Sequence, residues 1–322
     1  MTEADEYDNE IQEDNSLVPQ EENEEEVDNR VLVDPRAINH EIPLVHVEFV
    51  DAYSFRCLIE YLNLTNDDGN LIFTPKGIYY SRENDSKQIL NEIVINGHEL
   101  TRYEYNSDKD KVVSGLNMVQ FKGSTKKIGK KDIARLSVFN SGACLQVIGS
   151  PKMSSDDDMD LIRTQRLNHE YYTINGYQEE DEPNFTESMQ KFTSACSDQA
   201  SCKDDLVTVI GLERGIVMEA RQGGNLRACI KCLGRVEETT TIRSNSYSEK
   251  IARTSGKSLR IVVKYPNEIV RYRIPRRIVS ALSKLTNISP NGTVKVYMQP
   301  SLPIKLVFHI SSYGKLTIYL RS

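Results

Sequence analysis

The order of predicted helices and strands in the first half of this 322-residue chain is repeated in the second half. Apolar residues at helical spacing predict helices at 52–62 and 116–128, and again at 185–196 and from Pro275 onward. Runs of alternating apolar residues around these helices predict short strands. Because one helix–strand unit occurs twice, the pattern predicts an α+β fold built from two copies of that unit.

A shared hairpin pattern supports the repeat. The segment 73–80 corresponds to 211–218, and in both a basic residue and a glycine (Gly77, Gly215) precede isoleucine. The expected strands are 71–80 with a turn at 74–77, 88–95, 98–105, 132–139, 143–148, 206–210, 215–220, 225–233, 293–298, 304–310 and 316–320.

The composition along the chain predicts the domain boundaries. A polar stretch with few apolar residues separates the two halves, and a segment rich in Thr, Ser and charge interrupts the second half. We therefore expect an acidic disordered tail at 1–40, a first repeat at 41–150, a connecting linker at 151–182, and a second repeat at 183–322 with an insertion at about 236–257.

The net charge of −7 is unevenly distributed. Residues 1–30 hold 13 acidic residues and one base, whereas the remainder holds 39 bases and 34 acidic residues. An acidic tail of this composition is either a solubilising segment or a regulator that competes with nucleic acid. No apolar run approaches the roughly 18 residues of a membrane span, and the acidic N-terminus is unlike a secretory signal, so we expect an intracellular protein.

The sequence contains no pattern typical of catalysis or metal binding. The five histidines are scattered, and the acidic run 156–158 is typical of a solvated loop. Six cysteines in such a chain predict reduced thiols. Cys229 and Cys232 lie in an expected strand, where positions three apart face opposite sides and cannot share one metal. We expect no enzymatic activity, no metal and no cofactor.

Each expected helix pairs an apolar face with a polar face that holds bases. Such faces can neutralise phosphates and give sequence-independent affinity for DNA, although solvated helix faces also carry charge by default. The bases are Arg56 in the first helix, Lys122, Lys126 and Lys127 in the second, Lys191 in the third, and Arg276, Arg277 and Lys284 in the fourth.

Three segments of the chain resemble a known family. The C-terminal stretch 302–320 is similar to the closing motif of the eukaryotic and archaeal sliding clamps, the proliferating cell nuclear antigen (PCNA) type. The segments 115–118 and 159–161 resemble the entry to that family's second helix and the start of its linker. The resemblance implies the DNA clamp fold, with helices lining the bore of a ring and sheets outside.

The resemblance also implies the function. Sliding clamps are usually homotrimers that encircle double-stranded DNA, tether a DNA polymerase and other proteins with short clamp-binding motifs, and need a clamp loader. All eight bases named above are then expected to face DNA, while Cys57, Gly123 and Ser194 stand where the family often has bases.

A partner pocket is implied between the linker and the C-terminal strands. Its expected residues are Leu161, Ile162, Leu167, Pro303, Tyr319 and Leu320, although Tyr319 and Leu320 are equally typical of a core. The resemblance further places an acidic edge strand at 152–160 of one protomer against a basic strand at 225–233 of the next.

The tail and the insertion make the chain longer than typical cellular clamps. In this respect the chain resembles the clamps and clamp-like factors of large DNA viruses. We therefore expect a nuclear site or a cytoplasmic viral replication site. Two alternatives stay open: a clamp-fold viral transcription factor, and an interaction scaffold without a closed ring. Salt-dependent retention on DNA and the ring stoichiometry would separate them.

Overall fold

The computed structural model describes residues 42–140, 142–148, 159–162, 164–165, 176–178, 181–221, 228–236, 265 and 267–322. Contacts divide the chain into residues 1–32 and 33–322, and every described residue belongs to the second unit. The predicted tail, most of the linker and most of the insertion lie outside the described residues, as does Leu167.

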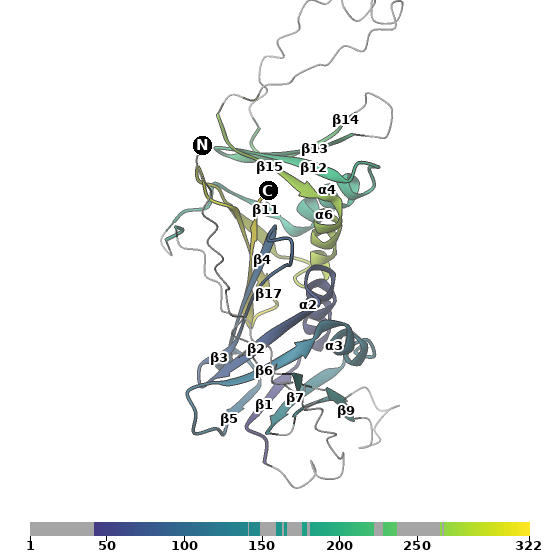
Figure 1. Ribbon diagram of the computed structural model, residues 1–322, viewed down its shortest axis with the longest axis vertical. Helices are drawn as coiled ribbons and strands as arrows, with labels where there is room; N and C mark the ends of the chain where they lie inside the picture. The colour runs from purple at the N-terminus through teal and green to yellow at the C-terminus, as the bar shows by residue number, and fades with distance from the viewer. Residues whose placement is uncertain are drawn as a thin grey trace, which may run out of the picture. The chain divides into compact units, whose positions relative to one another are not determined.

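The four α-helices of the described residues lie on one side of the sheets (Figure 1). They are α2 (Ala52–Thr65), α3 (Met118–Thr125), α4 (Met189–Ala200) and α6 (Arg276–Leu282), the last continued by the 3₁₀ turn η2 (Ser283–Asn287). The side chains of Asp51, Asn117 and Ser188 accept hydrogen bonds from backbone N–H groups in the first turns of α2, α3 and α4. These caps satisfy donors that have no partner within the helix.

The caps also explain where two predicted helix starts were wrong. Residues 185–188 form a strand, β11 (Phe185–Ser188), and helix α4 begins only after Ser188. Likewise α3 begins after Asn117, which ends strand β6 (Val112–Asn117). The predicted strand 98–105 is a short 3₁₀ turn, η1 (Gly97–Glu99), followed by β5 (Arg102–Tyr105).

The strands form three antiparallel sheets. Their orders are β5-β1-β7-β8-β9, β10-β6-β2-β3-β4-β18-β17-β16-β11, and β14-β13-β12-β15. The remaining bounds are β1 (Val45–Phe49), β2 (Asp68–Thr74), β3 (Gly77–Glu83), β4 (Ile89–Asn96), β7 (Ile133–Phe139), β8 (Gly142–Ile148), β9 (Met159–Ile162), β10 (Thr164–Gln165), β12 (Leu206–Leu212), β13 (Gly215–Arg221), β14 (Ala228–Gly234), β15 (Glu268–Pro275), β16 (Thr293–Tyr297), β17 (Ile304–Ile310) and β18 (Gly314–Leu320). Strands β1, β6, β10, β11 and β15 were missed by the sequence pattern.

The nine-stranded sheet joins the two halves. Strand β4 of the first half pairs with β18, the last strand of the chain, over seven residue pairs from Gly314–Ile95 to Leu320–Ile89. Helix α2 also packs against α6 and η2 of the second half. The halves therefore share one continuous backbone hydrogen-bond ladder and a helix contact.

The hairpin repeat is visible in the backbone. The β2–β3 turn pairs Thr74 with Gly77, and the β12–β13 turn pairs Leu212 with Gly215. At either glycine an added Cβ would overlap a carbonyl oxygen of the next strand, that of Ile95 on β4 or that of Leu233 on β14. The same close backbone approach thus recurs in both halves.

The expected apolar stripes form the core. Met118, Phe121, Thr125 and Ile128 are all fully buried. Phe55 of α2 stacks on Phe49 and meets Phe121 edge to face. Among the described residues, no helix is long and apolar enough to cross a membrane.

Candidate nucleic-acid interface and partner site

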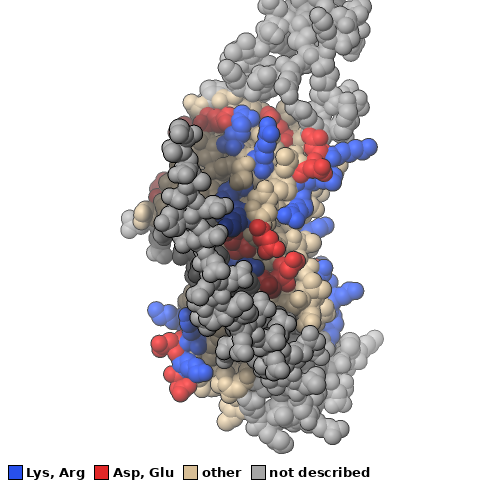
Figure 2. Space-filling view, in the orientation of Figure 1, with Lys and Arg blue, Asp and Glu red and all other residues tan. Residues whose placement is uncertain are grey.

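The polar faces of the helices carry the candidate DNA-binding bases. Lys and Arg side chains project from the side of the molecule on which the helices lie, together with some acidic side chains (Figure 2). Because only a cation without an acidic partner adds its full charge to a phosphate site, the contacts of each base decide its contribution.

Helix α3 and the turn after it form the most positive part of this surface, which we call the lysine segment (Lys122, Lys126, Lys127, Lys130 and Lys131). All of these except the half-buried Lys122 are exposed. Lys122 and Lys126 make no ion pair with any described residue. The carboxylate of Asp132, which follows Lys131 in the sequence, accepts the backbone N–H of Gly129 at 2.6 Å.

Arg56 on α2 is held by the protein itself. Its guanidinium donates to the Glu60 carboxylate at 2.7 Å and to the backbone carbonyl of Ile128 at 2.8 Å. It also lies 5.9 Å from the Tyr53 ring centre. Arg56 therefore ties α2 to the end of the α3 segment, and Glu60 neutralises its charge.

Lys191 on α4 is neutralised in a similar way. Its ammonium lies 2.7 Å from the carboxylate of Glu187, which also accepts the backbone N–H of Gly234 at 3.2 Å. Burial acts to raise the pKa of Glu187, but hydrogen bonds from Lys191, Gly234 and Ser188 outweigh it and lower the pKa below its ordinary value. The other exposed residues of α4 are the uncharged Gln190, Ser194 and Ser197, and the half-buried Asp198 forms an ion pair with Lys231 at 2.6 Å.

The α6 region again carries exposed bases. Arg276 donates to the carbonyl of Cys202 at 2.9 Å and lies 3.8 Å from Asp205, so it holds the helix start in place. Arg277 is exposed, and its guanidinium donates to the Ser86 hydroxyl at 3.2 Å. Lys284 in η2 is exposed and has no ion-pair partner in the described part of the chain.

Cys57, one of the three positions at which the sliding-clamp family often has a base, does not face the solvent. Cys57 is 5% exposed, and burial, followed by the nearby Glu60 carboxylate, raises the pKa of its thiol to about 11. A base at this position would not reach DNA. Gly123 and Ser194 are exposed, as the resemblance implied.

The described residues of the predicted partner pocket lie on or beside strands of two different sheets. Leu161 and Ile162 lie in β9, which pairs with β8 at the edge of the five-stranded sheet. Tyr319 lies on β18 of the nine-stranded sheet, and Leu320 is buried in the core. The structure therefore places Leu161 and Ile162 in a different sheet from Tyr319, and a shared pocket of these residues stays a prediction.

Tyr177, from the linker, contacts Pro303 and Tyr319. Its hydroxyl donates to the backbone carbonyl of Pro303 at 2.7 Å, and its ring centre lies 6.4 Å from that of Tyr319. Lys305 lies over the rings of Tyr177 and Tyr297, at 5.1 and 5.0 Å. Burial raises the pKa of Tyr177 well above its ordinary value. A tyrosine six residues before the second repeat was a signal for this contact that the sequence analysis missed.

The two strands expected at the protomer joint both lie at sheet edges. Strand β9 ends the five-stranded sheet and β14 ends the four-stranded sheet. Ile230 on β14 is 44% exposed, whereas Lys231 lies 2.6 Å from Asp198 of its own chain. Cys229 and Cys232 lie three positions apart on β14, as expected, and the described residues contain no cluster of metal-ligating side chains.

Comparison with known proteins gives the fold class. No family model and no curated protein sequence matches the chain. Among solved structures, PCNA from Entamoeba histolytica matches with a TM-score of 0.64 and 15% identity over 87% of this chain and 99% of that one. The PCNA2–PCNA3 complex from Sulfolobus tokodaii matches with a TM-score of 0.61 and 16% identity over 86% of this chain and 98% of that one.

The chain therefore has the DNA clamp fold of PCNA. This confirms the fold class expected from the repeat: two helix–strand units with helices on one side and sheets on the other. At 15–16% identity the similarity shows the fold alone, so the function has to be inferred from the residues of this chain.

Proposed function

We propose that the protein is a sliding clamp, a processivity factor that encircles duplex DNA and tethers replication proteins. The observation that carries this proposal is the pattern of exposed bases on α3 and α6 in a chain of the DNA clamp fold. Such a protein performs no chemistry. It raises the effective concentration of a polymerase at its template by making rebinding intramolecular.

The contacts divide the DNA-facing bases into two groups. The proposed phosphate contacts are the lysine segment, Arg277 and Lys284. Of these, Lys122, Lys126, Arg277 and Lys284 have no ion-pair partner among the described residues, whereas Arg56, Lys191 and Arg276 have acidic partners within the chain. The proposal therefore assigns most of the DNA affinity to the second helix of each repeat. Binding is independent of sequence, because phosphate contacts carry no base information.

Ring closure is proposed to use the two free sheet edges. Strand β9 of one protomer would pair with β14 of the next, which gives a closed homotrimer and leaves neither of these two edges exposed. Loading onto closed DNA then requires a clamp loader or spontaneous opening. We also propose the domain boundaries expected from the sequence, at 41–150, 151–182 and 183–322. The proposal further includes an intracellular site of action and a viral source.

Polymerases and other partners would dock beside Tyr177, Pro303 and Tyr319. The tyrosine rings offer an apolar surface with polar tips, which suits a short segment with an aromatic side chain. Lys305 and Glu92 flank this surface, and burial raises the pKa of the Glu92 carboxyl.

The test is retention of the protein on circular DNA before and after the DNA is linearised. A closed ring stays on the circle at high salt and slides off once an end is created. If the protein dissociates equally from both forms, it does not encircle DNA.

A clamp-fold transcription factor or scaffold without a closed ring is the second candidate. It is favoured by the internal neutralisation of Arg56 and Lys191, which leaves two of the four helices with little net charge. Equal dissociation from circular and linear DNA with retained salt dependence would select the transcription factor, and loss of DNA binding would select the scaffold.

A further inference from the structure

A polar cavity of about 110 Å³ lies where the two halves meet on the helix side. Its walls come from the end of α2 and the residues just after it, from the β3–β4 region, and from the start of α6. The lining includes Asn63, Asn66, Arg82, Asp85 and Arg277. The cavity is thus built from both repeats and is separate from the tyrosine cluster at Pro303.

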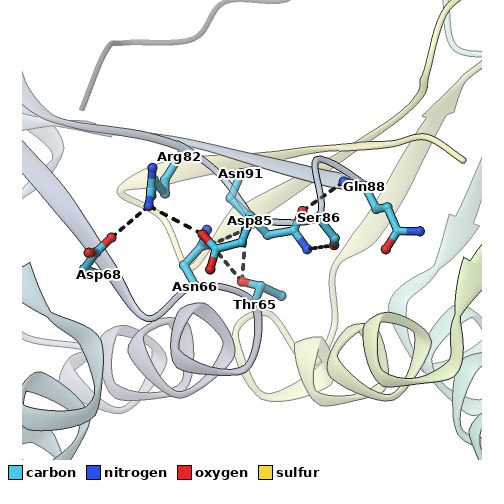
Figure 3. Close-up of polar contacts among 9 residues, drawn as sticks. Thr65, Asn66, Asp68, Arg82, Asp85, Ser86, Gln88 and Asn91 are labelled. Carbon is cyan, nitrogen blue, oxygen red and sulfur yellow. Dashed lines mark hydrogen bonds and ion pairs between the residues drawn. The ribbon is translucent and has the colours of Figure 1, made fainter. Parts of the chain in front are cut away.

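A hydrogen-bond network holds one wall in place (Figure 3). The amide of Asn91 donates to Thr65 Oγ1 at 3.0 Å and to Asn66 Oδ1 at 2.9 Å, and it accepts from the Tyr61 hydroxyl at 2.8 Å. Arg82 lies between Asp68, at 3.0 Å, and Asp85, at 3.8 Å. These contacts leave the wall residues few alternative positions.

Two atoms of this wall have no hydrogen-bond partner among the described residues. Asn63 Oδ1, an acceptor, and Asn66 Nδ2, a donor, are buried and make no hydrogen bond to any described protein group. Asn66 is 5% exposed. Leaving a buried polar atom without a hydrogen bond destabilises the fold, so we expect each of these atoms to have a partner that is not part of the protein.

The charges of the lining limit what that partner can be. Arg82 and Arg277 are balanced by Asp67 and Asp85, so the cavity favours neither an anion nor a cation. Leu64 and Ile278 are the only apolar side chains in the lining, which disfavours an apolar ligand. A neutral molecule that both donates and accepts hydrogen bonds fits, and the volume admits several waters at roughly 30 Å³ each.

We propose that this cavity binds a cluster of ordered water molecules that bridges the two repeats. The waters accept from Asn66 Nδ2, donate to Asn63 Oδ1, and connect the end of α2 to Arg277 at the start of α6. On the sheet side the halves are joined by the direct β4–β18 ladder, whereas on the helix side this part of the joint is bridged by water. The inference does not depend on the proposed function.

The first test is a crystal structure of the full chain at a resolution that shows individual waters, with a second crystal under xenon pressure. Water within hydrogen-bond distance of Asn63 Oδ1 and Asn66 Nδ2, and no xenon, is the expected result. Xenon in the cavity, an empty cavity or a bound ion would overturn the proposal, because dry cavities bind xenon and hydrated polar ones do not.

The second test works in solution and uses thermal unfolding of Asn63→Leu. If Asn63 Oδ1 bonds to water, the substitution removes that bond and the melting temperature falls by a few degrees. If Asn63 Oδ1 has no hydrogen bond because the cavity is dry, leucine removes this unsatisfied acceptor and the melting temperature rises. Ser197→Leu, on the exposed face of α4, controls for the helix propensity that leucine adds.

Discussion

At the scale of single residues, the structure separates bases that contact the protein from bases that remain available to a ligand. Arg56 and Lys191 matched the DNA-facing pattern as well as Lys126 did, since all are bases on the polar faces of helices. Glu60 and Glu187 lie four positions from Arg56 and Lys191, so these two ion pairs could have been read from the sequence. The bond from Arg56 to the Ile128 carbonyl could not.

Glu187→Gln is expected to strengthen DNA binding. The amide cannot neutralise Lys191, so α4 gains one available positive charge, and the dependence of log K on log salt steepens by roughly 0.9. Titration with duplex DNA at several salt concentrations measures this. Glu213→Gln, in the exposed β12–β13 turn, changes the net charge equally but should leave the slope unchanged.

The same carboxylate predicts a pH effect on stability. The pKa of Glu187 is lower in the folded chain than its ordinary value of 4.5, so the folded state favours the ionised form. The ionised Glu187 carboxylate therefore adds to the free energy of unfolding at pH values above its ordinary pKa. This stabilisation is lost as the pH falls through the pKa of the folded state. The difference in melting temperature between wild type and Glu187→Gln should therefore shrink on acidification, and a constant difference would contradict the ion pair.

Gly77→Ala is expected to destabilise the fold by more than about 2 kcal/mol. Gly77 has φ +148°, and a Cβ there would overlap the Ile95 carbonyl. Gly123→Ala is the matched control. No atom lies within 4 Å of a Cβ at Gly123 in α3, so alanine should stabilise by roughly 0.5–1 kcal/mol. Denaturant unfolding measures both, and equal effects would exclude the close backbone approach.

At the scale of elements, periodicity identified the cores of the helices and the N-terminal caps decided where they begin. The stripe through Phe185 and Met189 fits a helix, yet Phe185 belongs to β11, which pairs with β16. The missed strands all pair with strands distant in sequence: β1 with β5 and β7, β6 with β2 and β10, β11 with β16, and β15 with β12. Pairing of this kind has no local signal.

The two repeats should differ in how their helices contribute to DNA binding. Replacing Lys122 and Lys126 of α3 by alanine is expected to reduce the salt slope by up to roughly 2, because each phosphate contact contributes roughly 0.9. Lys191→Ala should change it little, since Glu187 already neutralises that charge. Replacing Lys126, Arg277 and Lys284 together tests both halves at once. An unchanged slope would exclude this surface as the DNA site.

At the scale of the whole molecule, the free edges β9 and β14 lead to the prediction of a closed trimer. Light scattering should give three times the chain mass of 36.7 kDa, or about 110 kDa. Ile230→Lys places a charge on the exposed edge of β14 and should shift the species toward monomer. Ile42→Lys, at a position 78% exposed before β1, should leave the mass unchanged. A monomeric wild type would favour the alternatives without a closed ring.

The sequence by itself determined the repeated units, the apolar faces of the four helices and the hairpin glycines, because these depend on spacings of a few residues. Only the tertiary structure decided which bases remain available and which groups form the sites. The contacts responsible join Arg56 to Ile128 across 72 positions, Tyr177 to Pro303 across 126, and Arg277 to Ser86 across 191. Such contacts depend on how strands pair into three sheets, and strand pairing is set by packing across the whole fold.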